Sequence, residues 1–274
     1  MMPVQYKNQY VTVFQSELYQ TTSTVAVTKD MILIVDPTWL PGEIETIRQH
    51  VAKNDAGQHK YLLFTHSDFD HIHGWKAFPE AVTIASRGFV DRTNKKKMVQ
   101  EAQDFEDYYY IERPYPVEYP QIDIIIDHDE QTIKNGDTSV SFYLAPGHQV
   151  DGVFAVVHEP GVLIAGDYVS DVEFPFIHHD SEAYERTVDK LEEVVDDKKI
   201  KLLIPGHGKC TTDRDEMRDR IGDSRWYIET LRDEIRQQKR LDVLEAFVDS
   251  YRFSRYLREE HENNKAQIQK EYRA

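Results

Sequence analysis

The chain has 274 residues, a formal net charge of −16 and 40% hydrophobic side chains, enough apolar material for one large domain or two small ones. The acidic excess argues against a nucleic-acid partner, because binding to phosphates draws its affinity from cationic side chains. No run approaches about 18 apolar residues, and the N-terminus lacks the basic and apolar segments of a secretory signal, so we expect a cytoplasmic protein without membrane contact. The single cysteine, Cys210, excludes an internal disulfide and fits a reducing compartment.

The first part of the chain is typical of antiparallel strands followed by a helix. Residues 10–36 alternate apolar and polar side chains and then become continuously apolar, with a turn at Lys29-Asp30. Pro41 then opens a predicted helix in which Ile44, Ile47 and Val51 recur at helical spacing.

A cluster of metal-capable side chains follows the next predicted strand, residues 61–66. Five imidazoles and carboxylates fall within eight residues: His66, Asp68, Asp70, His71 and His73. A turn at the end of a buried strand needs polar groups for its backbone, but it does not need alternating imidazoles and carboxylates. All of these except His73 can converge on a pair of divalent cations, because such ligands at ~2.0–2.2 Å suit zinc and its neighbours. His73 either supports a ligand or is an ordinary surface histidine.

Two aromatic segments each have two interpretations. From Arg87 to about Tyr110 the chain is charged and helical in character, and the prolines and tyrosines of residues 108–120 then stop any helix. That segment is either an ordinary surface excursion or a lid whose tyrosines contact substrate. Residues 174–179, which contain two phenylalanines followed by His178 and His179, either line an apolar substrate pocket or pack in the core.

Three later predicted strands also end in a glycine break and a metal-capable residue. Hairpins are predicted over residues 131–145 and 153–165, and they lead to His148 and Asp167; a strand at 201–205 leads to His207. Each break alone could be an ordinary turn. Because functional groups in layered α/β folds gather beyond the ends of strands, we expect all four segments to deliver ligands to one edge.

The last part of the chain is predicted to be helical. Residues 181–197 form an amphipathic pattern, and after Cys210 the sequence becomes long, charged and helical, which predicts two helices. They either cover the sheet or make a protein contact, for which a homodimer is one arrangement. Residues 257–274 are expected to be solvated. These patterns divide the chain into a domain over residues 1–210 and C-terminal helices over residues 211–274.

The four ligand segments together resemble the metallo-β-lactamase superfamily over residues 10–238. The family pattern His-x-His-x-Asp-His, followed by a distant His, a bridging Asp and a last His, maps onto His66, Asp68, Asp70, His71, His148, Asp167 and His207. The resemblance implies an α/β fold, a four-layer αβ/βα sandwich, here with a C-terminal helical extension. It also implies a two-metal site, in which His66, the residue at 68 and His148 hold one metal. Asp70, His71 and His207 hold the other, with Asp167 between the two.

Position 68 departs from the family, which usually has a second histidine there. With two divalent cations and a bridging hydroxide, a third carboxylate lowers the net charge of the site from about +1 to about zero. A less positive site acidifies bound water less and tolerates harder metals better. We therefore expect two divalent ions, zinc as the first expectation and iron or manganese as alternatives. The flavodiiron branch has a glutamate at this position and binds iron, which keeps a redox function open.

The leading functional hypothesis is metal-dependent hydrolysis of a small acyl substrate: a thioester, a lactone or a related ester. A metal-bridging hydroxide would attack the carbonyl, and Asp70 would orient this nucleophile and pass on its proton, with Asp167 between the metals. Tyr168 follows Asp167 directly, and its phenol could donate a hydrogen bond to a developing oxyanion. The alternatives are a diiron redox protein and a non-catalytic metal-binding sensor.

Overall fold

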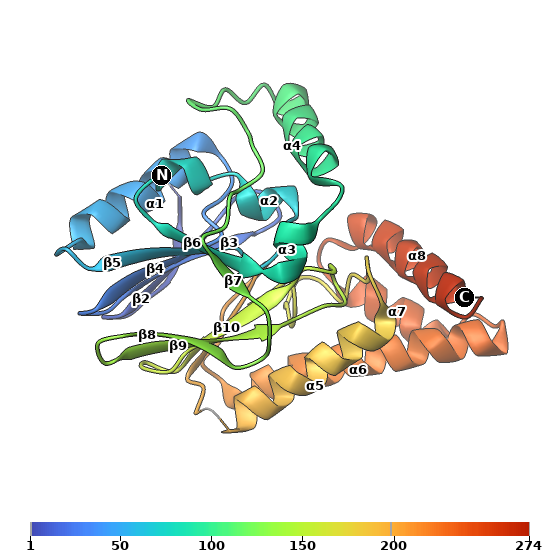
Figure 1. The fold of residues 1–274 in the computed structure, drawn as a ribbon. Coiled ribbons are helices and arrows are strands. Elements are labelled where there is room, and N and C mark those ends of the chain that lie inside the picture. Colours follow the sequence, from blue (N-terminus) through green and yellow to red (C-terminus); the bar gives the residue numbers. More distant parts are fainter. Residues whose placement is uncertain (1, 198, 274) are drawn as a thin grey trace.

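The computed structural model describes residues 2–197 and 199–273, and its elements form four layers. Two β-sheets pack face to face, and helices cover the outer surface of each sheet (Figure 1). One hydrophobic cluster fills the space between the sheets, and a separate cluster lies under the helices on each side. The predicted αβ/βα sandwich with C-terminal helices is therefore confirmed.

The first sheet contains seven strands that lie in the order of the sequence. They are β1 (Val4–Lys7), β2 (Val11–Gln15), β3 (Thr22–Val27), β4 (Met31–Val35), β5 (His59–Leu63), β6 (Val82–Ser86) and β7 (Ile124–Ile126). Strands β1 to β4 pair antiparallel, and β4 to β7 pair parallel. Met31, Leu33 and Val35 of β4 face the second sheet, whereas Ile32 and Ile34 face the helices. Burial on both faces explains why this strand is continuously apolar.

The second sheet contains five strands in the order β12-β11-β10-β9-β8. They are β8 (Gln131–Asn135), β9 (Thr138–Leu144), β10 (Val153–Val157), β11 (Val162–Gly166) and β12 (Leu202–Pro205). Strands β8 to β11 form the two predicted antiparallel hairpins, and β12 joins β11 in parallel. Parallel pairing brings the ends of β11 and β12 to the same edge of the sheet.

Helices lie on both sides of the sandwich. On the side of the first sheet they are α1 (Pro41–Asn54), the short α2 (Phe69–Ile72), the 3₁₀ helix η1 (Trp75–Ala77), α3 (Arg87–Asp91) and α4 (Lys95–Tyr109). On the side of the second sheet, α5 (Ser181–Asp197) and α6 (Arg214–Gln237) lie along its outer surface, and α7 (Asp242–Ser250) and α8 (Ser254–Glu271) pack against α6 (Figure 1). The helices after residue 210 share one hydrophobic cluster with α5 and the second sheet, and a domain boundary at residue 210 stays a prediction.

Several predictions about local structure were wrong. Strands β1 and β6 were not anticipated, and β5 ends at Leu63 rather than at residue 66, although residues 64–66 remain buried. Three helices rather than two follow residue 210 among the described residues. The segment after residue 257 is not solvated, since α8 buries Leu257, His261, Asn264 and Ile268. Polar side chains that make hydrogen bonds across the interface had concealed this packed face.

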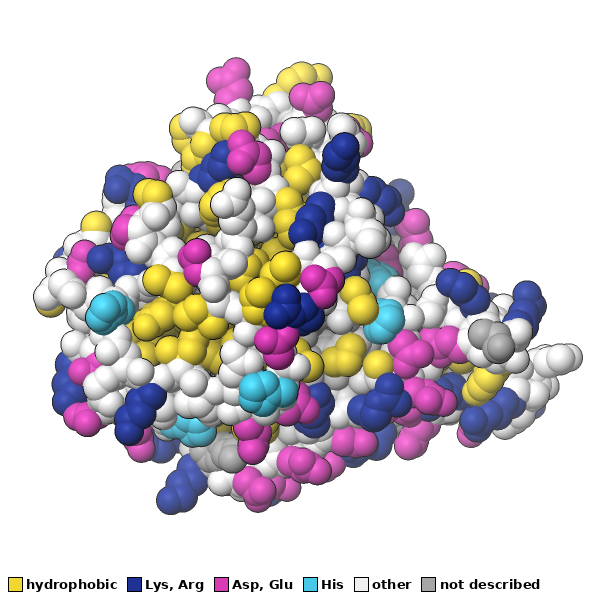
Figure 2. Space-filling model, in the orientation of Figure 1, with side chains coloured by type: hydrophobic (Ala, Val, Ile, Leu, Met, Phe, Trp, Pro, Cys, Tyr) yellow, Lys and Arg dark blue, Asp and Glu magenta, His cyan; other side chains and the backbone are white. Residues whose placement is uncertain are grey.

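The surface is strongly charged. On the face shown in Figure 2, Lys and Arg side chains lie interspersed with Asp and Glu side chains. Within residues 2–197 and 199–273, no helix combines the length and the apolar character needed to cross a lipid bilayer.

Candidate metal centre

The structure brings all seven predicted metal donors together at one edge of the sandwich. His66 and Asp68 lie in the loop after β5, and His148 lies in the loop after β9. We call these three residues the first donor set. Asp70 and His71 lie in α2 and His207 follows β12, and these form the second donor set. Asp167, which directly follows β11, lies between the two sets.

The donor atoms of the first set lie at similar distances from one another. The Oδ2 atom of Asp68 is 3.5 Å from Nε2 of His66 and 3.2 Å from Nε2 of His148. The Oδ2 atom of Asp167 is 3.4 and 3.3 Å from the same two nitrogens. Ligands at ~2.0–2.2 Å from a tetrahedral zinc ion lie about 3.3–3.6 Å apart, so these four donors are spaced to hold one cation.

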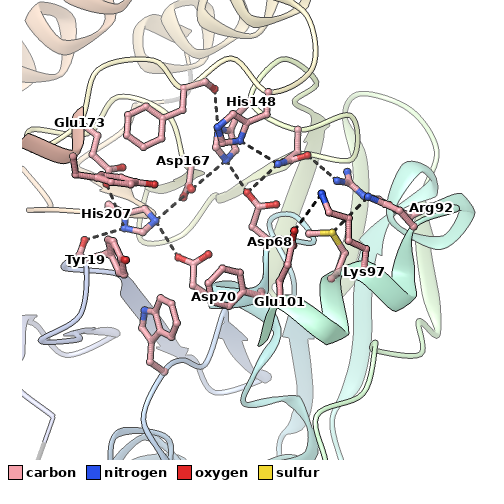
Figure 3. Close-up of a pocket in the computed structure, with 18 residues that line it drawn as sticks. Tyr19, Asp68, Asp70, Arg92, Lys97, Glu101, His148, Asp167, Glu173 and His207 are labelled. Atoms are coloured by element: carbon pink, nitrogen blue, oxygen red, sulfur yellow. Dashed lines mark hydrogen bonds and ion pairs between the residues drawn. The ribbon is translucent and has the colours of Figure 1, made fainter. Parts of the chain in front are cut away.

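The second set has the same spacing. The Oδ2 atom of Asp70 lies 3.3 Å from Nε2 of both His71 and His207. Asp167 reaches His71 with Oδ1 and His207 with Oδ2, each at 3.3 Å, so its carboxylate contacts both sets. Glycine at position 206 makes room for this carboxylate, since a Cβ there would lie 2.0 Å from Oδ1 of Asp167. Figure 3 shows Asp68, Asp70 and Asp167 directed toward the imidazoles of His148 and His207.

The unpaired polar atoms of the centre support its fit to metal ions. Four buried donor atoms make no hydrogen bond: Nε2 of His66, His71 and His148, and Oδ1 of Asp167. Each of them nevertheless lies close to a carboxylate oxygen or an imidazole nitrogen of another donor residue. Buried polar atoms without partners are rare in proteins, because each one costs desolvation energy. These atoms converge on shared points without making hydrogen bonds to one another, which is the arrangement that a cation would satisfy.

Each imidazole is oriented by a hydrogen bond on its other nitrogen. Nδ1 of His71 donates to Oδ2 of Asp36 at 3.0 Å. Nδ1 of His148 donates to the carbonyl of Phe176 at 2.9 Å. Nδ1 of His207 donates to the carbonyl of Tyr19 at 2.9 Å. Donation from Nδ1 leaves the Nε2 lone pair free to bind a metal, as in most histidine metal sites.

Asp36 supports a second imidazole through Thr65. The Thr65 hydroxyl donates to Oδ2 of Asp36 at 2.5 Å, and it lies 3.1 Å from Nδ1 of His66, from which it can therefore accept. The Thr65 amide also donates to Asp36. The sequence analysis did not identify Asp36 as part of the site. A signal was present, because Asp36 follows the apolar strand β4 in the same way that the predicted ligands follow their strands.

The carboxylates and imidazoles shift one another's ionisation. Burial opposes the charged form of His148, but Asp167 and Asp68 outweigh it and raise the pKa of His148 to about 10. Burial likewise opposes the charged form of His71, and the neighbouring carboxylates raise its pKa well above the usual range. Despite burial, the imidazoles of His148 and His66 hold the pKa of Asp68 well below its usual range. The protein without metal thus carries protons on these imidazoles near neutral pH.

Asp68 has its own support. The Gln149 amide nitrogen donates to Oδ2 of Asp68 at 3.0 Å, and the Gln149 carbonyl accepts from the Arg92 guanidinium at 2.8 Å. His178 also lies at this point, with Nδ1 3.3 Å from the Gln149 nitrogen and a donor atom close enough to Asp68 and His148 to complete a third group of candidate ligands. Gln149 and Arg92 were not among the predicted site residues.

A pocket of about 480 Å³ opens onto the donors. Its lining includes five aromatic side chains, Tyr19, Trp39, Phe69, Phe176 and Tyr256, and the charged side chains of Arg92, Lys97 and Glu101 (Figure 3). None of the tyrosines in residues 108–119 lines it, and Tyr108 and Tyr110 are 76% and 93% exposed. Phe176 and His178 line the pocket, and Phe174 and Phe176 both belong to the hydrophobic core.

Two residues considered from the sequence, Tyr168 and His73, do not line the pocket that opens onto the donors. The Tyr168 hydroxyl is buried and accepts from the backbone amide of His148 at 3.0 Å while donating to the carbonyl of Ala145 at 2.9 Å. Both hydrogen bonds tie it to the loop that carries His148, and Tyr168 does not line the pocket. His73 is buried rather than on the surface, and it stacks on Trp39 with ring centroids 5.6 Å apart.

A buried carboxyl that the sequence analysis missed adjoins His207. Glu173 lines the pocket, and its Oε1 atom lies 3.9 Å from Nδ1 of His207. Burial raises the pKa of Glu173 to about 7. Glu173 is six residues from the nearest predicted ligand in the sequence and follows no predicted strand, so the sequence contained no signal for it.

Comparisons with known proteins agree with this geometry. The family model of the metallo-beta-lactamase superfamily matches residues 17–207. A metallo-beta-lactamase from Pontibacter korlensis has a similar structure, with a TM-score of 0.58, 16% identity, and coverage of 82% of this chain and 99% of that one. The sec-alkylsulfatase Pisa1 from Pseudomonas sp. has a TM-score of 0.65 and 12% identity, with 82% of this chain but only 42% of that one covered.

An archaeal metallo-beta-lactamase superfamily protein from Sulfolobus tokodaii is also similar, with a TM-score of 0.54 and 16% identity over 79% of this chain and 86% of that one. At these identities the structural likeness concerns the fold alone. No curated protein sequence matches the chain.

Proposed function

Because this chain belongs to the metallo-beta-lactamase superfamily and holds two adjacent donor sets, we propose that it is a two-metal hydrolase of a small acyl substrate, a thioester, lactone or related ester. The observation that carries the proposal is the shared Asp167 carboxylate, which lies 3.3–3.4 Å from imidazoles of both sets. Divalent cations bound there would supply an acidified water molecule and polarise the scissile carbonyl.

The protein side chains would supply orientation and proton transfer. Asp70 lines the pocket, and its carboxylate is held between His71 and His207 at 3.3 Å from each. From that position it can accept the proton of an attacking water and pass it to the leaving group. A nucleophilic serine or cysteine is not needed. Tyr168 would act by holding the His148 loop and not by contacting the substrate.

The pocket walls support a substrate that is partly apolar. Tyr19, Trp39, Phe69 and Phe176 present rings to the cavity, and such side chains bury apolar groups of small ligands. The cationic side chains on the opposite wall are already paired, since Arg92 contacts Asp151 and Lys97 contacts Glu101. An acyl group with an apolar body fits this lining better than a polyanion. The absence of a nucleic-acid partner, the cytoplasmic location and a homodimer through the C-terminal helices stay predictions.

Metal analysis followed by substrate assays tests the proposal. Protein purified without chelator should contain two divalent ions per chain, with zinc as the first expectation and iron or manganese as alternatives. The loaded protein should hydrolyse at least one member of a panel of thioesters and lactones and should leave phosphodiesters intact. Failure of the fully loaded protein to cleave any thioester, lactone or ester would contradict the proposal.

One observation favours a second candidate. Asp68 places a third carboxylate among the donors, 3.2 Å from His148, and such a site suits iron better than an all-histidine first set does. The second candidate is therefore a diiron redox protein. Two irons per chain, together with oxygen reduction by the chemically reduced protein and no ester cleavage, would favour it over hydrolysis.

A further inference from the structure

We propose that the C-terminal helix α8 positions the first donor set, and that Asn264 and Glu260 are the positioning residues through which it does so. The inference rests on the proposed function in that the first donor set must bind a cation. It adds a role for a segment that contributes no ligand of its own. Two separate chains of hydrogen bonds connect α8 to His148 and to Asp68.

The first chain starts at the loop of residues 174–181. The carbonyl of Phe176 accepts from Nδ1 of His148 at 2.9 Å, and the amide of His178 donates to the carbonyl of His148 at 3.0 Å. This loop therefore holds both the ring and the backbone of His148. The orientation of the imidazole depends on where the Phe176 peptide lies.

Asn264 of α8 fixes that peptide from both sides. Its Oδ1 atom accepts from the amide of Ile177 at 2.7 Å, and its Nδ2 atom donates to the carbonyl of Pro175 at 2.6 Å. Asn264 is fully buried, and its Nδ2 atom also donates to the Tyr227 hydroxyl at 3.0 Å. One amide thus clamps the residues on either side of Phe176. A buried amide with all of these partners is rigid, because any displacement would leave polar groups unsatisfied.

The second chain runs through His178. The Glu260 carboxylate lies 3.1 Å from Nε2 of His178 and accepts a hydrogen bond from it. Nδ1 of His178 then faces the Gln149 amide nitrogen at 3.3 Å, and that nitrogen donates to Oδ2 of Asp68 at 3.0 Å. Because Arg92 fixes the other end of the Gln149 amide, its nitrogen must face Asp68. Aspartate reaches less far than histidine, so its carboxylate depends on this support.

The second donor set is supported from the N-terminal half of the chain. His71 is held by Asp36, and His207 is held by the backbone carbonyl of Tyr19. Helix α8 does reach Tyr19, since the Tyr256 ring packs against the Tyr19 ring at 5.9 Å between centroids. That contact involves side chains and does not fix the carbonyl that binds His207. Changes at Asn264 and Glu260 should therefore act on the first set and spare the second.

The experiment measures zinc affinity by competition with a chromophoric chelator in two backgrounds of the full chain. Asp70→Ala leaves the first set as the stronger site, and Asp68→Ala leaves the second. Adding Asn264→Ala should weaken zinc binding about tenfold in the Asp70→Ala background, as expected for loss of a group that orients ligands. The same change should alter binding less than about twofold in the Asp68→Ala background.

Controls separate positioning from general destabilisation. Gln269→Ala shortens an exposed polar side chain of the same helix and should leave both affinities unchanged. Glu260→Ala leaves the buried Asn264 contacts intact, so the protein stays folded, and it should weaken only the first site, by about threefold. In protein without metal, Asn264→Ala should also speed hydrogen exchange at the Ile177 amide.

Equal weakening at both sites, or no weakening at the first, would overturn the inference while leaving the proposed function standing. Weakening confined to the first site, in a protein whose unmodified, metal-loaded form hydrolyses no ester, would instead contradict the proposed function and support the inference. If the unmodified chain binds neither zinc, iron nor manganese, both are wrong.

Discussion

The two donor sets contain nearly the same chemistry but are supported by different parts of the chain. Each combines two imidazoles with a carboxylate and shares Asp167, and the donor distances in both lie between 3.2 and 3.5 Å. The second set depends on Asp36 after β4 and on the Tyr19 carbonyl before β3. Two members of the first set, His148 and Asp68, depend on Phe176 and Gln149 and through them on α8, whereas its third member, His66, shares Asp36 with the second set through Thr65.

This difference shows that identical ligands do not imply identical sites. The groups around a ligand fix its orientation and its basicity, so they set how tightly each cation is held. Support from separate segments allows the two affinities to change independently. The predictions below, ordered from the largest expected effect to the smallest, test how far that independence extends.

Asp167→Ala should change the cation affinities of both donor sets together. The Asp167 carboxylate contacts imidazoles of both sets. Its loss should therefore weaken the binding of both cations by at least ~100-fold, which is more than the loss of a supporting group would cause. Metal content after gel filtration and zinc competition would measure this. Asp171→Ala is a matched control, since Asp171 lies four residues away and binds the Lys209 amide instead. Native affinity at either site would show that Asp167 is not shared.

Asp36→Asn should act mainly on the second site. Both oxygens of Asp36 accept hydrogen bonds, and asparagine keeps only one acceptor oxygen and is uncharged. The support of His71 should therefore weaken, and the second zinc should bind ~10–100-fold more weakly. A smaller effect at the first site is expected through Thr65 and His66. Asp123→Asn is the control, because Asp123 accepts from the amide and hydroxyl of Thr83 as Asp36 does from Thr65, but far from the site. An equal effect on both cations would remove the proposed difference in support.

Cation binding should release protons from both sets. The pKa of His148 is raised to about 10, and the pKa values of His71 and His207 are also raised, so these rings are protonated near neutral pH without metal. A cation must displace those protons, and zinc affinity should fall as the pH is lowered, by about tenfold per pH unit for each proton released. Calorimetry in two buffers of different ionisation enthalpy counts the protons. Zinc binding without proton release would contradict the assignment of these rings as ligands.

Asp68→His should make the two sets less alike, because it replaces the carboxylate of the first set with a third imidazole. Removing one carboxylate leaves the loaded site more positive, so the apparent pKa on the acidic limb of the pH–rate profile should fall, by roughly one unit. The profile would be measured with the best substrate found for the unmodified protein. A limb that does not move would indicate that Asp68 is not a direct ligand.

Tyr168→Phe should have the smallest effect on the chemistry. It removes hydrogen bonds to the amide of His148 and the carbonyl of Ala145, so the free energy of unfolding should fall by about 1–3 kcal/mol. Turnover of the metal-loaded protein should stay nearly unchanged. Tyr184→Phe is a suitable comparison, because the Tyr184 ring packs against Tyr168. A large loss of turnover at unchanged stability would show that the Tyr168 hydroxyl reaches the substrate.

Much of the fold, and all seven residues of the two donor sets and the shared Asp167, could be predicted from the sequence. Apolar runs that end in glycine and a histidine or aspartate indicated both the strands and their common edge, because strand ends in a layered sheet meet at one side. Asp36 carried the same signal and was overlooked. Strand β6 was missed because residues 82–86 form a short and weakly patterned run.

The role of α8 could not be predicted in the same way. Its buried face includes Glu260, His261 and Asn264, polar residues that a sequence pattern assigns to solvent. They are buried because each finds a partner more than 30 residues away: Glu260 at His178, His261 at Tyr227 and Asn264 at Ile177.

The sequence by itself determined which residues can bind metal and which strands carry them, because both depend on residue type and local periodicity. Only the tertiary structure decided what holds each ligand in place. A hydrogen bond between distant segments leaves no periodic trace in either of them, so Gln149, Phe176 and α8 became part of the site only when the chain was folded.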